Sequence, residues 1–157
     1  MRIPKIYLET SVFNFVFADD APERRDNTIK LFNEIRGGLY RPFTSVYVTE
    51  EINNASAEIK EKIFKYMSNY DIKNLHKTNE IEHLADEYVM EGIIPLKYRT
   101  DALHIAAATV NELDIIVSWN FEHIVKRKTN IMTEVVNLHN GYKKIEIYSP
   151  EEVINGV

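Results

Sequence analysis

Acidic and amide side chains stand where apolar segments of the chain begin or end. Glu9 follows the apolar run 6–8, Asp101 opens an Ala-rich segment, and Asn120 follows the apolar run 115–117. In an open α/β sheet, ligands bind in the crevice beyond the carboxyl ends of the strands, so these residues are expected to face one crevice. Carboxylate and amide oxygens are the ligands that Mg²⁺ and Mn²⁺ prefer. The pattern therefore predicts a carboxylate-lined metal pocket.

Two further acids, Glu50 and Glu51, lie side by side in a predicted helix. Adjacent helical residues do not share a face, so we expect one of them to point inward and the other outward. Taken alone, each acid also fits an ordinary role in a turn or at a helix N-terminus. Together they favour a metal site, because neighbouring carboxylates repel one another unless a cation compensates. His104 and Trp119 are interpreted as packing residues, the latter at the rim of the pocket.

Other chemistries fit the sequence poorly. The chain has no cysteine, which excludes disulfides, thiolate zinc sites and a thiol nucleophile. It contains no phosphate-binding Gly-rich loop, no dinucleotide-binding Gly pattern, no Gly-x-Ser-x-Gly elbow and no His-Glu-x-x-His pair. The pair Asp19-Asp20 is similar to a phosphoacceptor pocket, but it lies well past the first predicted strand.

Length and composition favour a single globular domain over residues 1–157. The chain is 45% hydrophobic and 27% charged. Its net charge of −5 differs from the positive charge that is typical of proteins that bind nucleic acid through their overall charge. A nuclease is still allowed, because bound cations change the local field. No apolar run approaches the roughly 20 residues that span a membrane, and the N-terminus lacks a signal-like apolar region. We expect a cytoplasmic protein with no membrane partner.

Helical and strand patterns alternate along the chain. Strands are expected at 3–8, 39–45, 71–76, 114–117 and 144–148. Helices are expected from Asp20 to the Gly37-Gly38 stop, from a cap at Thr49, and at 57–67, 80–91, 100–112 and 130–140, with a final turn at 149–152. Pro42 is expected to place its strand at a sheet edge or to shorten it. The alternation predicts an α/β fold, a three-layer α/β/α arrangement with a mostly parallel central sheet.

Four segments resemble the successive motifs of PIN domains. They are Tyr7-Leu8-Glu9-Thr10-Ser11, Glu51-Ile52, Asp101-Ala-Leu-His104-Ile-Ala and Ile116-Val-Ser-Trp-Asn120-Phe. PIN domains are metal-dependent ribonucleases, and they include the VapC-like toxins of toxin–antitoxin pairs. The resemblance extends roughly from Lys5 to Ile147, and its most specific part is the Asp101 segment followed by Ser-Trp-Asn.

The resemblance implies a PIN-like fold and assigns roles to individual residues. Glu9, Glu51, Asp101 and Asn120 become the catalytic and metal-binding residues, and the three hydroxyl residues that support them are Thr10, Ser11 and Ser118. Two departures from the family pattern stand out. Glu9 is one methylene longer than the usual Asp, and Asn120 replaces a fourth acid with a neutral amide. Three carboxylates easily match one divalent ion, whereas a second ion is less well compensated.

The implied activity is that of a Mg²⁺- or Mn²⁺-dependent endoribonuclease, in which the metal activates water and stabilises charge on the attacked phosphate. Single-stranded or looped RNA is the expected substrate. The resemblance also implies a toxin role with an antitoxin partner, and a homodimer. Two alternatives stay open. One is a PIN-fold binding module that has lost catalysis, which the departures at Glu9 and Asn120 favour. The other is a structural α/β domain whose acids coincide by chance.

Overall fold

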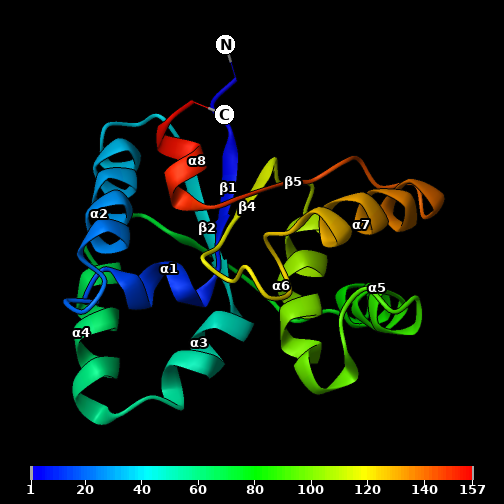
Figure 1. Ribbon diagram of the computed structural model, residues 1–157, viewed down its shortest axis with the longest axis horizontal. Helices are drawn as coiled ribbons and strands as arrows, with labels where there is room; N and C mark the ends of the chain where they lie inside the picture. The colour runs from blue at the N-terminus through cyan, green and yellow to red at the C-terminus, as the bar shows by residue number, and fades with distance from the viewer. Residues whose placement is uncertain (1, 157) are drawn as a thin grey trace.

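Five parallel strands form the centre of the fold in the computed structural model, which describes residues 2–156 (Figure 1). The strands are β1 (Lys5–Leu8), β2 (Arg41–Ser45), β3 (Lys73–Leu75), β4 (Ile115–Val117) and β5 (Glu146–Tyr148). The helices are α1 (Thr10–Phe15), α2 (Pro22–Arg36), α3 (Val46–Asn53), α4 (Ala57–Met67), α5 (Asn79–Met90), the 3₁₀ turn η1 (Leu96–Tyr98), α6 (Arg99–Val110), α7 (Arg127–His139) and α8 (Pro150–Ile154).

The first strand of the chain lies in the middle of the sheet, whose order is β3-β2-β1-β4-β5. Tyr7 is in register with Phe43 of β2 and with Ile116 of β4, and all four strand pairs are parallel. All strands therefore end at the same edge, and the segments that follow β1 and β4 leave the sheet side by side there. The predicted α/β architecture with a parallel sheet is confirmed.

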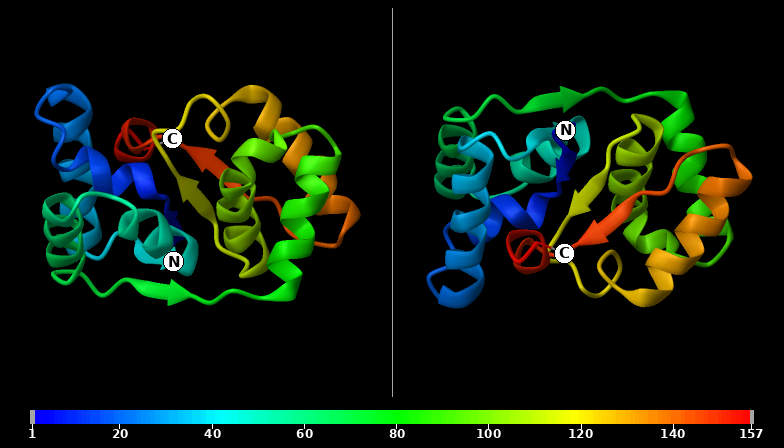
Figure 2. Two further views of the ribbon diagram at one scale, coloured as in Figure 1. Left: turned by 90° about the horizontal axis from the view of Figure 1, so that it is seen from below. Right: turned by 90° about the horizontal axis from the view of Figure 1, so that it is seen from above.

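Helices cover both faces of the sheet. The helices α1, α2, α4 and α8 gather on one side, and α5, α6 and α7 on the other (Figure 2). Ile6, Tyr7 and Leu8 of the central strand are fully buried between these layers. Helix α6 is buried continuously from Ala102 to Thr109, and its alanines allow close approach to the sheet and to α5. The helix is buried all round, which explains why it shows no amphipathic stripe.

The start of α3 differs from the prediction. The helix begins at Val46, and Ser45, the last residue of β2, caps it by accepting a hydrogen bond from the Tyr47 N–H at 3.2 Å. Thr49 lies inside the helix and donates its hydroxyl hydrogen back to the Ser45 carbonyl instead. The prediction of Thr49 as the cap was wrong because a serine at the strand end already satisfies the first turn.

Pro42 does not place its strand at a sheet edge, but the strand is short, as the alternative expectation has it, because it begins at Arg41 rather than at residue 39. The strand β2 lies between β1 and β3, but its pairing with β3 begins only at Phe43. Pro42 is the second residue of β2 and precedes this pairing, so its missing N–H costs no ladder hydrogen bond. Two helical segments also differ from the expectation: α1, which follows Glu9 directly, was not expected, and α7 starts at Arg127 rather than at residue 130.

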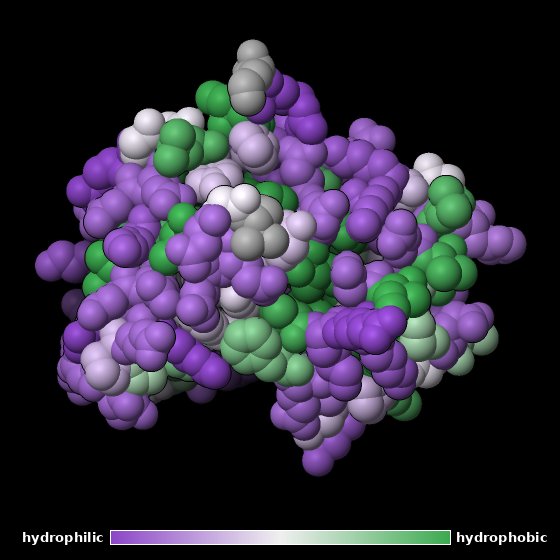
Figure 3. Space-filling view, turned by 45° about the horizontal axis from the view of Figure 1, so that its top comes forward, coloured by the Kyte–Doolittle hydropathy of each residue, from purple (hydrophilic) through white to green (hydrophobic). Residues whose placement is uncertain are grey.

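One helix carries an unusually apolar outer face. Ile131, Val135 and Leu138 of α7 are exposed at helical spacing, and Figure 3 shows apolar side chains on the part of the surface where α7 lies.

Within residues 2–156, no helix combines the length and the apolar character needed to cross a bilayer.

Candidate metal centre

Glu9 sits where the central strand ends and α1 begins. Its backbone N–H donates to the Val117 carbonyl at 3.1 Å, which continues the pairing of β1 with β4 by one residue. Its side chain is almost completely buried, the residue being 4% exposed. The Oε1 atom accepts hydrogen bonds from Ser11 Oγ and Ser118 Oγ, each at 2.6 Å. Two hydroxyls from neighbouring elements therefore fix the orientation of this carboxylate.

The same two serines also anchor the segment that follows β4. Ser11 Oγ accepts from the Trp119 N–H at 2.8 Å, and Ser118 Oγ accepts from the Asn120 N–H at 2.9 Å. Asn120 Oδ1 accepts from the His123 N–H at 3.0 Å. The amide oxygen of Asn120 is thus engaged in a local turn, next to the residues that orient Glu9.

Glu51 and Glu50 point in different directions, as helix geometry requires. Glu51 Oε1 accepts from Thr10 Oγ1 at 2.5 Å and lies 2.5 Å from His104 Nε2. Glu50 instead pairs with Lys77 Nζ at 3.3 Å on the surface. Of the two acids, Glu51 is therefore the one that faces the edge of the sheet where β1 ends.

His104 connects Glu51 to the buried sheet. The imidazole is fully buried, and its Nδ1 lies 2.6 Å from Tyr7 Oη, which in turn lies 2.6 Å from Ser45 Oγ. A carboxylate only accepts hydrogen bonds, so Nε2 carries the hydrogen of the contact with Glu51. The interpretation of His104 as a packing residue is incomplete, because its ring nitrogens connect Glu51 to Tyr7 in the core. The sequence signal for this is its spacing of three from Asp101, which places both on one face of α6.

The pKa shifts of this pair have the signs of an ion pair. Burial lowers the pKa of His104, but its bond to Glu51 and the charges of Glu9, Glu51 and Asp101 outweigh burial and raise it. Burial raises the pKa of Glu51, but the bond and charge of His104, with the Thr10 hydroxyl, outweigh that effect and lower it. Both shifts favour a carboxylate facing an imidazolium.

Asp101 lies in the first turn of α6 and is partly buried. Burial raises its pKa above the usual value, as does the charge of Glu9, while His104, the Asn120 side chain and His123 oppose the shift. Asp101 is close enough to Glu9 and His104 for their charges to shift its pKa, so Asp101 lies near the centre. Its carboxylate stands outside the tight group that Glu9, Glu51 and His104 form.

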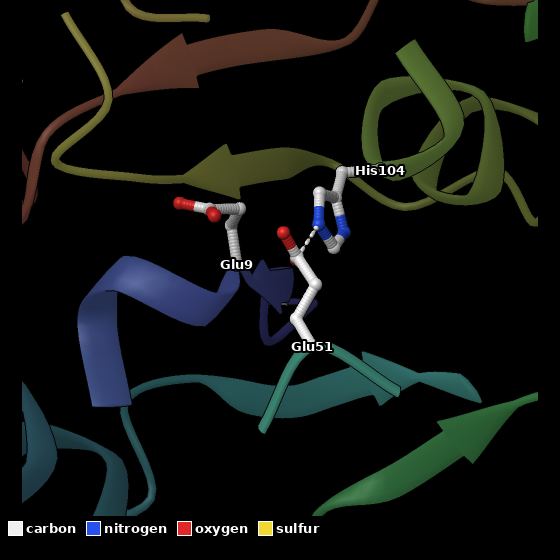
Figure 4. A group of neighbouring side chains, drawn as sticks. All are labelled: Glu9, Glu51 and His104. Atoms are coloured by element: carbon white, nitrogen blue, oxygen red, sulfur yellow. Dashed lines mark hydrogen bonds and ion pairs between the residues drawn. The ribbon is translucent and has the colours of Figure 1, made fainter. Parts of the chain in front are cut away.

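Ligand atoms of Glu9, Glu51 and His104 all lie within 4.8 Å of one another (Figure 4). Glu9 comes from the end of β1, Glu51 from α3 and His104 from α6, and the figure shows Glu51 and His104 joined by a hydrogen bond, with Glu9 beside them and its carboxylate turned away from that pair. Ligands of one Mg²⁺ ion at bond lengths near 2.1 Å stand up to roughly 4.2 Å apart, so small side-chain shifts suffice. The two carboxylates offer the oxygen donors that Mn²⁺ and Mg²⁺ prefer, whereas His104 carries a hydrogen on Nε2 and acts as the partner of Glu51 rather than as a ligand.

A cavity of about 290 Å³ opens beside Glu51. Its walls carry both signs of charge, with Glu50 and Glu82 facing Lys77 and Arg99. Arg99 is held by Asp86 at 2.8 Å and by Glu82 at 3.4 Å. The cavity gives solvent access to the less buried side of the centre, where the Glu51 side chain is 35% exposed.

Comparison with known proteins supports the fold alone. No protein-family model matches the sequence, and no curated protein matches it. Among solved structures, the chain is similar to one in the crystal structure of VapBC2 from Rickettsia felis bound to a DNA fragment from their promoter. The TM-score is 0.54 at 13% sequence identity, and the match covers 92% of this chain and 98% of that chain. The structural similarity spans nearly the whole length of both chains, and the fold is PIN-like.

Proposed function

We propose that this chain is a Mg²⁺- or Mn²⁺-dependent endoribonuclease, built as a single PIN-like domain over residues 1–157. The observation that carries the proposal is the convergence of Glu9, Glu51 and His104 at the carboxyl edge of a parallel sheet, with Asp101 beside them. Acids that gather at this position of an α/β sheet suit a site for a divalent cation and its ligand.

Each residue of the site has a defined task in the proposed reaction. Glu9 and Glu51 hold the ion, and Asp101 and Asn120 add oxygen atoms at the same edge. The hydroxyls of Ser11 and Ser118 keep the Glu9 carboxylate in one orientation, and Thr10 does the same for Glu51. When bound, the ion supplies activation of water and stabilisation of charge on the phosphate.

Single-stranded or looped RNA is the proposed substrate, because its backbone is accessible from one side. Lys77 and Arg99 line the cavity beside Glu51, and a phosphate that binds there would exchange for the acids that pair with them. A toxin role in the cytoplasm, restrained by an antitoxin, is proposed from the resemblance of the motifs and from the structural similarity to a chain of a VapBC2 complex. A homodimer is proposed on the motif resemblance alone.

A second candidate function is a PIN-fold binding module without catalysis. Two oxygen atoms that are already engaged favour it. Glu51 Oε1 is already engaged by Thr10 and His104, and Asn120 Oδ1 is already engaged by the His123 N–H. A cation therefore meets fewer free oxygen atoms at this edge of the sheet than the sequence suggests.

Cleavage of end-labelled single-stranded RNA in Mn²⁺ separates the two functions. If the chain is a nuclease, EDTA should abolish cleavage and Asp101→Ala should remove it. Asp20→Ala should cleave like the wild type, because Asp20 is an exposed acid outside the site. Calorimetric titration of Mn²⁺ accompanies the assay. A folded protein that neither binds Mn²⁺ nor cleaves RNA is the binding module.

A further inference from the structure

Three aromatic rings gather around the guanidinium of Arg24. Its Cζ lies 5.2 Å from the ring centroid of Trp119, 5.1 Å from that of Phe121 and 5.7 Å from that of Phe15. The rings also contact one another, with centroids 5.6 Å apart for Phe15 and Trp119 and 6.1 Å apart for Trp119 and Phe121. We call Arg24, Phe15, Trp119 and Phe121 the aromatic platform. Contacts of this kind hold a guanidinium plane in a fixed place.

The platform has a rigid base and an exposed top. Trp119 is 4% exposed, and its Nε1–H donates to Thr28 Oγ1 at 2.8 Å. Phe121 is 43% exposed, and Arg24 is exposed beside it. A large aromatic ring that remains in water next to a buried, hydrogen-bonded indole offers a preformed face to a flat ligand.

Arg24 lacks an acidic partner within residues 2–156, which sets it apart from its neighbour. Arg25 pairs with Asp19 at 3.0 Å and with Asp26 at 3.1 Å, whereas no ion pair of the described residues involves Arg24. Its guanidinium donors are therefore free for an anion, and guanidinium geometry matches a phosphate.

The platform is joined to the metal centre through the backbone. The Trp119 N–H donates to Ser11 Oγ, and that hydroxyl donates to Glu9. Phe121 directly follows Asn120. A ligand stacked on Phe121 consequently lies beside the crevice in which the proposed cleavage takes place.

We propose that the aromatic platform binds one nucleotide of single-stranded RNA next to the metal centre. The base stacks on the exposed ring of Phe121, and Arg24 donates to the adjoining phosphate. This subsite rests on the proposed function, because it names how the substrate of that site is held. The chain carries a net charge of −5, so contacts of this kind must come from local groups rather than from the overall field. Every base has a π face, so the subsite should tolerate any sequence.

RNA binding tests the subsite without depending on cleavage. A short fluorescein-labelled oligoadenylate is titrated with the protein in EDTA, and anisotropy reports the dissociation constant. Phe121→Leu keeps an apolar side chain but removes the ring, and it should weaken binding about tenfold, the usual effect of losing one stacked base. Arg24→Lys keeps the charge but loses the planar fork, and it should weaken binding several-fold.

Matched controls lie on neighbouring positions. Phe17→Leu removes another exposed ring, one that contacts Tyr66 and not Arg24, and Arg25→Lys alters an arginine that is already paired. Both should bind RNA like the wild type. Phe121→Tyr retains an aromatic ring and should also bind RNA like the wild type. This variant separates the loss of stacking from damage to the fold.

The outcomes distinguish this inference from the nuclease assignment. Wild-type RNA affinity in folded Phe121→Leu and Arg24→Lys overturns the subsite, even if the protein cleaves RNA. The subsite is equally overturned if the folded wild-type protein binds no RNA. Weakened binding in both variants, in a protein that shows no metal-dependent cleavage, supports the subsite and overturns the nuclease.

Discussion

Glu51 Oε1 lies 2.5 Å from Nε2 of the fully buried His104, so a side chain of α3 is bonded to one of α6 at the carboxyl edge of the sheet. The raised pKa of His104 and the lowered pKa of Glu51 both favour the charged forms of this pair. The imidazolium offsets part of the repulsion among the acids before any cation arrives. A divalent ion that binds here must therefore compete with His104 for the Glu51 carboxylate.

Replacing Glu51 should affect metal binding far more than replacing its neighbour. Glu51→Gln removes a charge that faces the centre, and because ligand charge tunes cation affinity, Mn²⁺ should bind at least about tenfold more weakly. Glu50→Gln removes a charge that faces Lys77 on the surface and should leave Mn²⁺ affinity nearly unchanged. Isothermal titration of Mn²⁺ into the two folded variants measures the difference. Equal affinities would exclude Glu51 from the metal site.

Tyr7→Phe should show how much the buried hydrogen bonds of Tyr7 with His104 and Ser45 stabilise the folded protein. The change deletes the hydroxyl between His104 Nδ1 and Ser45 Oγ, and a buried ring nitrogen left without a partner costs about 1–3 kcal/mol. Tyr142→Phe is the matched control, because its hydroxyl donates to Glu80 at the surface and should contribute less than about 0.5 kcal/mol. Urea unfolding at neutral pH gives both values. A loss as small for Tyr7→Phe as for the control would show that the network adds little to stability.

Position 120 is where the chain departs most from the pattern of the family that it resembles. Asn120→Asp adds a carboxylate near Glu9 and Asp101, so Mn²⁺ should bind more tightly, and the metal-free protein should become less stable. One oxygen of the new side chain still accepts from the His123 N–H, which leaves the other for the cation. Calorimetric titration and thermal melts in EDTA test the two halves.

Asn120→Ala is the companion variant. It loses the bond to the His123 N–H, worth about 1 kcal/mol, and should reduce any Mn²⁺-dependent cleavage much less than Asp101→Ala. Unchanged Mn²⁺ affinity in a correctly folded Asn120→Asp protein would mean that residue 120 does not face the metal.

Stability in acid should depend on Asp114, which precedes β4. Its carboxylate accepts from the Lys5 N–H at 2.7 Å, from Arg2 at 2.7 and 2.9 Å, and from Lys143 at 3.0 Å. Burial raises the pKa of Asp114, but these hydrogen bonds outweigh it and hold the pKa well below its usual value of 3.8. A carboxyl group whose pKa is depressed in the folded state stabilises the fold at pH values above the pKa of the unfolded chain. That stabilisation is lost as the pH falls from about 4 toward the pKa of the folded state.

Asp114→Asn should therefore unfold more easily than the wild type at pH 7, by about 1 kcal/mol, since Arg2 and Lys143 are exposed and screened. The difference should shrink as the pH falls below about 4. Urea midpoints recorded from neutral to strongly acidic pH measure it, with the exposed Asp20→Asn as control. A constant difference across this range would contradict the assigned pKa shift.

The elements with strong hydrophobic patterns could be predicted from the sequence. The buried first strand, the Ala-rich helix and the parallel sheet follow from apolar runs separated by helical segments. Helix α1 was not expected, because it has only six residues and follows Glu9 without a turn residue. The start of α3 was misplaced because a strand-ending serine and a helical threonine both look like caps.

The site was harder to predict from the sequence than the fold. Spacing indicated which acids stand at element ends, but side-chain direction depends on partners that are remote in sequence. Glu51 meets His104, 53 positions away, and no local pattern reveals that contact. Asn120 is similar: its type suggests a ligand, whereas its oxygen accepts from an N–H three residues later.

The bond between Glu9 and Ser118 spans 109 positions of the chain. The strand that precedes Glu9 is made first, yet its neighbour β4 is made only in the last third of the sequence. During synthesis, the amino-terminal part can pair β1 with β2, but Glu9 has no Ser118 to orient it until that residue leaves the ribosome. Closing so long a loop is also a late event in folding. The proposed metal centre is therefore incomplete while most of the chain is still being translated.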